Sequence, residues 1–367
     1  MIDRDELGAW LRLLETPGLG RESARRLLAA FGSPKAAIAA EAGARRAVVG
    51  PLQSTVLDTV PAGLPALIAA TLAWLSADAA EPRAVITIDD ARYPQALLES
   101  PDPPLLFYAQ GRLDLLQARA IAIVGSRNPT PQGADNARAF ASHLSHAGLT
   151  VVSGLALGVD AAAHTGGLEG ASGTIAVVGT GLDIVYPRRN LGLAHRIAAE
   201  GLIVSEYAFG TPSMAPNFPR RNRIIAGLAS GTLVVEAALK SGSLITARLA
   251  NEAGRDVFAI PGSIHSPQSR GCHALIKQGA KLVEDAADIF DELRLPAVLA
   301  GGTAQADSTH ADEPVLAALG FDPVTLDALV ARTGLGAAEL STRLLGLELD
   351  GRVARLPGQL FQRRTSR

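Results

Sequence analysis

The chain of 367 residues is long enough for two or three domains, and 48% of its residues are hydrophobic. No apolar run is long enough to cross a bilayer, which argues against a membrane span, and the formal net charge of −2 gives no global sign of a nucleic-acid binder. Cys272 is the only cysteine, which excludes an internal disulfide. With no basic and apolar leader in residues 1–6, we expect a cytoplasmic protein.

Residues 1–80 are predicted to form a domain of short helices. Apolar residues at helical spacing indicate amphipathic helices over 7–14 and 23–31. The turn between them, at 16–20, is typical of a helix-hairpin-helix, whose backbone N–H groups bind DNA phosphate without reading sequence. The alternative is a helical bundle in which this turn has no ligand.

Residues 81–295 alternate between strand-like and helix-like runs, which predicts an α/β domain with a doubly wound parallel sheet. The predicted strands are 84–88, 120–124, 150–152, 174–178, 202–204, 232–235 and 257–260. Ligands of such sheets bind at the carboxyl ends of the strands. The informative loops are therefore 125–133, 153–160, 179–190, 206–223 and 236–244.

The first of these loops has the pattern of an anion site. It follows the fully apolar strand 120–124 with Gly125, Ser126 and Arg127, and a helix is predicted over 133–147. Unpaired N–H groups at a helix start suit a phosphate, and Arg127 adds a permanently charged planar fork.

The other loops carry further anion-binding residue types. Besides the first loop, the candidates are Ser153, Gly154, Arg188, Arg189, Phe218, Arg221, Asn222, Arg223, Lys240 and Ser241. Arginines, helix N-termini and an aromatic ring for stacking favour single-stranded nucleic acid as the ligand. The alternative is that the arginine pairs lie on a solvated face and that Phe218 belongs to the core.

Patterns for catalysis, metal or cofactor binding are missing or incomplete. Neither a dinucleotide-binding G-x-G-x-x-G nor a Walker A pattern is present. Asp160 and His164 lack a third metal ligand, and a hydrogen bond between them that holds a helix is the preferred interpretation. Serines such as Ser205 have no candidate base at a recognisable spacing. We therefore expect no catalytic residue, no metal and no cofactor.

The C-terminal part is predicted to be a winged-helix domain over 314–367, joined by a polar linker over 296–313. Helical runs at 315–319, 325–331 and 337–347 precede a short hairpin at 351–361. The helix over 337–347 lacks the basic face of a major-groove reader, so protein docking and DNA binding both remain open.

Between 85 and 290 the chain resembles the family of the DNA-processing protein DprA, also called Smf. The resemblance rests on an ordered set of segments: 124–127 (VGSR), 153–160 (SGLALGVD), 178–183 (VGTGLD), Tyr186-Pro187, 218–227 (FPRRNRIIAG), 241–248 (SGSLITAR) and 257–262 (VFAIPG). One departure is visible, because His273 stands where the family usually has Asn, and we expect a local adjustment there.

The resemblance implies a non-enzymatic protein that binds single-stranded DNA entering during natural transformation (competence), protects it, and helps load the recombinase RecA for DNA recombination. It implies a homodimer, and an extended Rossmann-like domain between an N-terminal SAM-like helical domain and a C-terminal winged helix. The family's Gly-Ser-Arg loop would hold phosphate through residues 125–127. Its Phe-Pro-x-Arg-Asn-Arg segment places Phe218 and residues 221–223 at the same pocket, together with Arg188 or Arg189.

The rival class is an enzyme. Residues 230–236 (SGTLVVE) are similar to the phosphate loop of nucleotide phosphoribohydrolases, although Glu236 falls one position late and the leading Pro-Gly-Gly is absent. We interpret this as a phosphate cradle without hydrolytic use.

Overall fold

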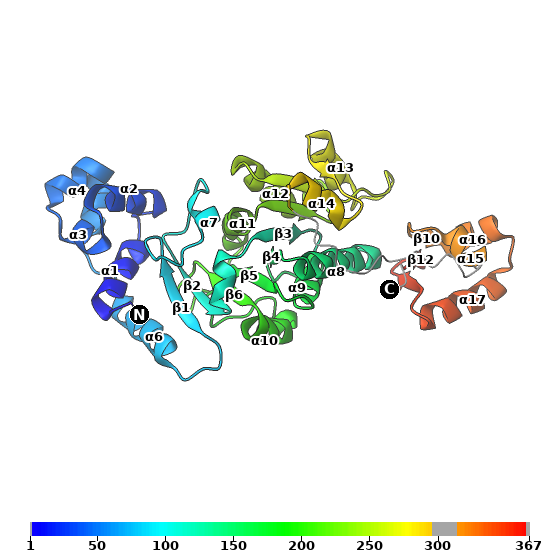
Figure 1. Cartoon of the computed structure of the whole chain (residues 1–367), viewed down its shortest axis with the longest axis horizontal. Helices are drawn as coiled ribbons and strands as arrows, with labels where there is room; N and C mark the ends of the chain where they lie inside the picture. Colours follow the sequence, from blue (N-terminus) through cyan, green and yellow to red (C-terminus); the bar gives the residue numbers. More distant parts are fainter. Residues whose placement is uncertain (1, 296–313, 365–367) are drawn as a thin grey trace.

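A computed structural model describes residues 2–295 and 314–364. The chain is elongated, with a group of helices at one end, a large sheet with its helices in the middle, and a small helical unit with a hairpin at the other end (Figure 1). The predicted linker at 296–313 lies outside the described residues. Within the described part, no helix has the length and apolar character needed to cross a bilayer.

The N-terminal helices form a small bundle, as predicted. They are α1 (Arg4–Glu15), α2 (Arg21–Phe31), α3 (Pro34–Ala39), α4 (Ala42–Val49), α5 (Pro51–Val56) and α6 (Leu64–Ser76). Helix α1 begins after Asp3, whose carboxylate accepts the Glu6 N–H at 2.7 Å. The apolar faces of α1 and α2 bury Trp10 and Leu27, and Tyr108 of the sheet joins the same core.

The central sheet has nine strands in the order β1-β2-β6-β5-β4-β3-β7-β8-β9. The strands are β1 (Arg83–Thr87), β2 (Leu106–Gly111), β3 (Ala120–Val124), β4 (Thr150–Ser153), β5 (Thr174–Val178), β6 (Leu202–Ser205), β7 (Gly231–Val234), β8 (Asp256–Ala259) and β9 (Lys281–Leu282). The seven predicted strands are all present, and β3 to β9 pair in parallel. Strands β2 and β9 were not predicted, and β1 and β2 form an antiparallel edge.

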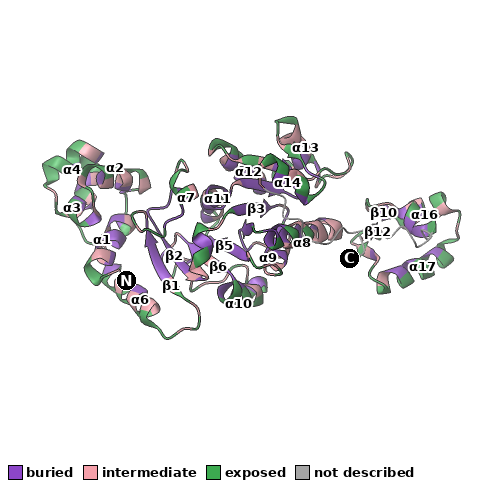
Figure 2. Cartoon of the chain, viewed as in Figure 1, coloured by how far each residue is buried: buried purple, intermediate pink, exposed green. Residues whose placement is uncertain are grey.

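Helices cover both faces of this sheet, so its strands are buried on two sides (Figure 2). The helices are α7 (Gln95–Leu98), α8 (Pro131–His146), α9 (Val159–Gly167), α10 (Leu191–Glu200), α11 (Asn217–Leu228), α12 (Ser243–Glu252), α13 (Arg270–Lys277) and α14 (Ala286–Glu292), with 3-10 turns η1 (Leu113–Gln117) and η2 (Arg188–Asn190).

Strand β3 is the middle of the core, and its side chains alternate between the two faces. Ala122 and Val124 face α11 and α12, whereas Ile121 and Ile123 face α8 and α9. Truncation of Ile123 to alanine would cost about 2–5 kcal/mol, as for other buried aliphatic side chains. The chain order reverses between β3 and β7, the position at which doubly wound sheets bind ligands.

The C-terminal part is a winged helix, as predicted. It consists of α15 (Pro314–Leu319), β10 (Val324–Thr325), α16 (Leu326–Thr333), α17 (Ala337–Leu349), β11 (Val353–Leu356) and β12 (Leu360–Arg363). Its contact with the central part includes a two-pronged ion pair from Arg364 to Asp135 of α8, with both bonds at 2.8 Å.

Candidate nucleic-acid interface

The loops at the carboxyl ends of the parallel strands enclose one cavity of about 790 Å³. It lies beyond the carboxyl ends of the neighbouring strands β3 and β7, where the chain order reverses, and its lining includes the loops after β3, β4 and β5, α11 and the start of α12. The predicted residues that line it are Gly125, Ser126, Arg127, Phe218, Arg221, Asn222, Lys240 and Ser241. Segments distant in the sequence therefore meet at this one place, as the doubly wound topology requires.

An exposed cation and two aromatic rings stand together on the wall of this cavity. The guanidinium carbon of Arg127 lies 5.9 Å from the centre of the Phe218 ring, within cation–π range. The Tyr186 ring lies 5.4 Å from the Phe218 ring and is tilted by 39°. Gly179 leaves room for Phe218, because a Cβ there would lie 3.2 Å from its ring. Within the described residues Arg127 has no ion-pair partner, so its charge is available to a ligand.

Arg221 lies deeper and is held by the backbone. Its side chain donates to the Gly154 carbonyl at 2.6 Å and to the Val177 carbonyl, and the residue is only 4% exposed. Burial lowers the pKa of Arg221 to about 10, and the nearby charge of Arg127 acts in the same direction. Gly154 must be glycine, because a Cβ there would collide with this guanidinium. Arg221 thus forms the floor of the cavity and fixes the loop after β4.

Asp160 and His164 fix the same loop instead of pairing with each other. The Asp160 carboxylate accepts the N–H groups of Gly154 and Ala156 at 3.1 and 3.2 Å, and burial raises its pKa. The predicted His–carboxylate hydrogen bond is therefore wrong. Asp160 and Arg221 thus both bind the backbone of the loop after β4.

His164 is neutral and makes a hydrogen bond with each of its two ring nitrogens. Its Nε2 accepts the Leu155 N–H at 3.2 Å, and its Nδ1 donates to Thr174 Oγ1 at 2.7 Å, because that hydroxyl itself donates to the Val151 carbonyl. Burial first, and the charge of Arg221 second, lower the pKa of His164 to about 3. These bonds hold Leu155 at a φ of 56°, a left-handed conformation that is costly for leucine.

The start of α8 is not open to an external anion, which corrects the sequence-based expectation. The Thr130 hydroxyl accepts the Gly133 N–H at 3.0 Å and caps the helix. The carboxylate of Glu236 in turn accepts the Thr130 N–H at 2.9 Å and its hydroxyl at 2.6 Å. Glu236 therefore occupies the position at which a phosphate would meet the first turn of α8. Burial raises the pKa of Glu236.

The start of α12 also lines the cavity, and its first N–H groups are bonded to oxygens of the preceding turn. Lys240 is exposed and has no ion-pair partner among the described residues. The Ser241 hydroxyl accepts the Ser243 N–H at 3.3 Å and lies 2.7 Å from the Ser243 hydroxyl. The helix dipole and the lysine both favour negative charge here. Among the described residues, the cavity thus presents two cations without an ion-pair partner, Arg127 from the loop after β3 and Lys240 from the loop after β7.

The remaining predicted residues lie elsewhere. Arg223 donates to Asp102 at 2.7 Å and to Glu206, and α2 joins this cluster through Arg21 and Arg25. Arg223 therefore binds α11 to the N-terminal helices and does not line the cavity.

Four further predicted residues also lie off the cavity lining. The Ser153 hydroxyl is buried and donates to the Ile123 carbonyl at 2.7 Å, and Gly154 lies beneath Arg221. Arg188 and Arg189 in η2 are both exposed. Ser153 and Gly154 thus support the loop, and the two arginines remain outside the cavity.

Several lining residues were not among the candidates, namely Asn128, Tyr186, Ser213, Thr246 and Gln268. The sequence could have indicated Tyr186, because it belongs to the Tyr-Pro pair among the segments that resemble the family. No sequence pattern indicated Gln268, because it follows β8 in an irregular loop. Its side-chain amide donates to the Asn128 carbonyl at 3.4 Å. The Nε2 of His273 in α13 lies 2.9 Å from the Gly262 carbonyl oxygen, and the local adjustment expected at that position stays a prediction.

Curated relatives and solved structures match most of the chain. It is 42% identical over 283 residues to Protein Smf of Escherichia coli, covering 75% of this chain and 76% of that protein. It is 49% identical over 205 residues to DNA processing protein DprA of Streptococcus pneumoniae, covering 56% and 72%. The crystal structure of the pneumococcal protein matches with a TM-score of 0.68 at 38% identity, covering 78% of this chain and 97% of that one.

A Helicobacter pylori structure, described as giving insight into the single-stranded DNA binding mode of DNA processing protein A, matches with a TM-score of 0.53 at 32% identity. It covers 57% of this chain and 95% of that one. The model for DNA recombination-mediator protein A matches residues 84–294, and the model for the DprA winged helix domain matches residues 302–359. The chain therefore belongs to the DNA recombination-mediator protein A (DprA, Smf) family.

Proposed function

We propose that this chain is a DNA-processing protein that binds single-stranded DNA in the cavity at the carboxyl ends of β3 and β7. The observation that carries the proposal is the wall formed by Arg127, Phe218 and Tyr186, which offers a phosphate contact beside a stacking surface. Two relatives support it, since the pneumococcal one is named a DNA processing protein and the H. pylori title refers to single-stranded DNA.

In this mechanism the strand contacts the protein mainly through its backbone. Arg127 and Lys240 bind successive phosphates, and the dipole of α12 favours negative charge beside Lys240. A base stacks on Phe218 or Tyr186, which works for any base because every base has a π-face. Arg221 holds the loop after β4 in place, and its buried guanidinium does not neutralise a DNA phosphate. Binding is therefore tolerant of sequence and sensitive to salt.

The test is a comparison of single-strand and duplex oligonucleotides by fluorescence anisotropy, using the full chain at equal salt. Preferential binding of the single strand is the expected result. Preference for the duplex would place DNA binding in the terminal domains and would contradict the proposal.

The family relationship supports a wider cellular proposal. The protein acts in the cytoplasm during natural transformation, protects the incoming strand, and loads RecA on it as a homodimer. Its parts are a helical domain (1–80), a Rossmann-like DNA-binding domain (81–295), a linker (296–313) and a winged helix (314–367). Pull-down of RecA by the full chain in the presence of single-stranded DNA tests the loading step, and the absence of any RecA complex would contradict it.

We infer that the chain is not an enzyme. The carboxylate that a nucleotide hydrolase would use corresponds to Glu236, and here it is engaged by Thr130 at the cap of α8. Incubation of the purified protein with nucleoside monophosphates should release no free base. Release of base that disappears in Glu236→Gln would reverse this conclusion.

A further inference from the structure

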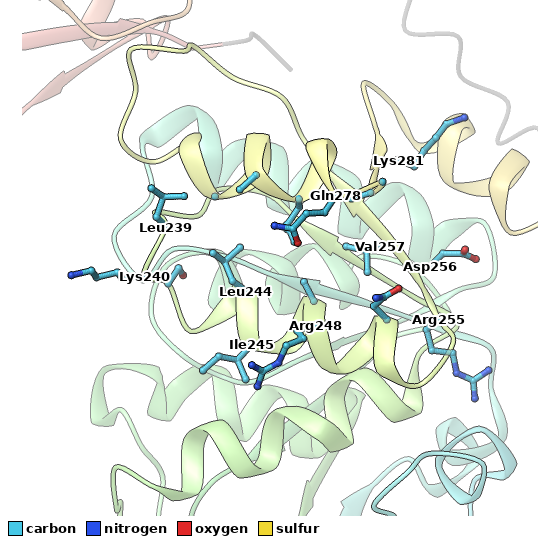
Figure 3. A pocket seen from close by; sticks show the side chains of 18 of the residues that line it. Leu239, Lys240, Leu244, Ile245, Arg248, Arg255, Asp256, Val257, Gln278 and Lys281 are labelled. Atoms are coloured by element: carbon cyan, nitrogen blue, oxygen red, sulfur yellow. The ribbon is translucent and has the colours of Figure 1, made fainter.

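A second groove of about 590 Å³ lies beside the DNA cavity, between α12 and α13 (Figure 3). Lys240, Ser241 and Ile245 line both, so the start of α12 is a ridge common to the two. A DNA strand that leaves the cavity over Lys240 enters the groove directly, because the same residues line both. This adjacency makes the groove a continuation of the binding surface.

The interior of the groove matches the chemistry of a nucleobase. Leu244 and Leu275 face it from α12 and from α13, and Val257 of β8 contributes further apolar surface. Two side-chain amides, Asn251 and Gln278, also line it, and within the described residues neither makes a side-chain hydrogen bond. Figure 3 shows Gln278 extending from the end of α13 toward α12. Free amides beside an apolar slot can bind the polar edge of a flat heterocycle.

The two ends of the groove differ in charge. Arg248 pairs with Glu252, Arg255 with Glu99 and Lys281 with Glu292, each at 3.4 Å. Lys240 is the remaining cation of the lining, and within the described part it has no carboxylate partner. A phosphate is therefore favoured at the ridge. At the opposite end the lining includes the carboxylate of Asp256, which has no ion-pair partner among the described residues and disfavours a phosphate there (Figure 3). A free nucleotide would bring its phosphate toward this carboxylate, whereas an internal nucleotide of a strand can keep its phosphate at Lys240.

We propose that the groove between α12 and α13 is an additional base-binding subsite of the same DNA strand, with Lys240 bound to the connecting phosphate and Asn251 and Gln278 bound to the edge of an unstacked base. This inference rests on the proposed single-strand binding in the main cavity. It adds a length requirement that the main cavity alone does not impose. It also predicts base contacts through hydrogen bonds, where the main cavity uses stacking.

The test uses fluorescence anisotropy with oligothymidines of increasing length and the full chain. The variant Asn251→Ala/Gln278→Ala removes both amides, which are exposed and unpaired, and Gln53→Ala on α5 is the amide control. For the shortest oligonucleotide that binds, all three proteins should have the same affinity. As the oligonucleotide becomes longer, the affinity of the double variant should rise less than that of the parent and the control. For the longest oligonucleotide its affinity should be lower than theirs by a factor of about two to ten for each amide that is removed.

The alternatives give distinct results. If the double variant gains affinity with length as the parent does, the groove is not a subsite, although the main cavity stands. If Arg127→Ala binds oligonucleotides of every length like the parent, the proposed function itself fails. Sedimentation velocity without DNA covers a third case. A loss of self-association in the double variant, with unchanged length dependence, would show that a second copy of the chain occupies the groove and would overturn the inference.

Discussion

The guanidinium of Arg127 lies over the ring of Phe218, with 5.9 Å between its central carbon and the ring centre. The first residue follows β3 and the second opens α11, so their contact depends on the topology of the whole sheet. The ring restrains the guanidinium without neutralising it, because an aromatic face attracts the cation but carries no net charge. The pair thus orders a cation whose charge stays available for a phosphate.

Replacement of Arg127 by alanine should weaken single-strand binding and flatten its salt dependence. Loss of one neutralised phosphate reduces the log–log salt slope by about 0.7 on single strands. Arg127→Lys should keep the slope but lose affinity, because lysine lacks the planar fork. Arg196→Ala on α10, an exposed arginine outside the cavity, is the matched control. An unchanged slope in Arg127→Ala would show that this residue contacts no phosphate.

Replacement of Phe218 by alanine should weaken binding with no change in the salt slope. A stacked base contributes about 1–3 kcal/mol, and Phe218→Trp should retain that contribution because its ring also stacks. Anisotropy titrations at several salt concentrations separate this effect from that of Arg127. Equal affinities of Phe218→Ala and the parent would assign the ring to packing alone.

The sequence predicted the position of the site better than the orientation of its side chains. The alternation of strands and helices is a local pattern, and it is sufficient to bring the loops of residues 125–127, 218–222 and 240–241 to one edge. The direction of each arginine depends on partners that no local pattern identifies. Arg221 turns to the Gly154 carbonyl and Arg223 to Asp102, although both belong to the same short motif.

Two other features depend on long-range contacts and were missed for that reason. Glu236 comes from the loop after β7 and occupies the start of α8, where it takes the place of an anion that the helix alone would attract. Strand β2 pairs antiparallel with β6, and the helix between β1 and β2 is the four-residue α7, which is too short to indicate an α/β unit in the sequence.

Replacement of Arg223 by glutamine should destabilise the protein and leave the salt slope of DNA binding unchanged. The side chain is 10% exposed and its partner Glu206 11%, so its loss removes the most buried cation of the cluster and leaves the carboxylates paired only with the more exposed Arg21 and Arg25. Because those partners remain and Asp102 is 31% exposed, we expect a loss of about 1.5–3 kcal/mol in unfolding free energy, less than for a buried charge left without any partner. Chemical denaturation measures this.

Arg220→Gln is the control for that experiment, because Arg220 is exposed on the same helix. It should unfold like the parent. A reduced salt slope in Arg223→Gln, with normal stability, would instead make Arg223 a phosphate contact.

His164 should make the protein less stable as the pH falls below 6.5. The pKa of His164 is lowered from 6.5 to about 3 in the folded state, so the unfolded chain takes up the proton first. Its contribution to stability is complete above pH 6.5 and is lost as the pH falls toward 3, at up to about 1.4 kcal/mol per pH unit.

The measurement is the unfolding free energy of the parent and of His164→Gln over this pH range. The variant should lack this part of the slope, whereas His146→Gln, at an exposed histidine of α8, should keep it. Parallel curves for the parent and His164→Gln would mean that folding does not lower the pKa of His164.

The most direct measurement is photocrosslinking of the full chain to a single-stranded oligonucleotide that carries a halogenated uracil, followed by identification of the modified peptides. Because the stacked base is proposed to lie against Phe218 or Tyr186, the crosslinks should fall on those two residues and should diminish in Arg127→Ala. Crosslinks confined to the helices before residue 80 or to the winged helix would place the strand elsewhere and would contradict the proposed interface.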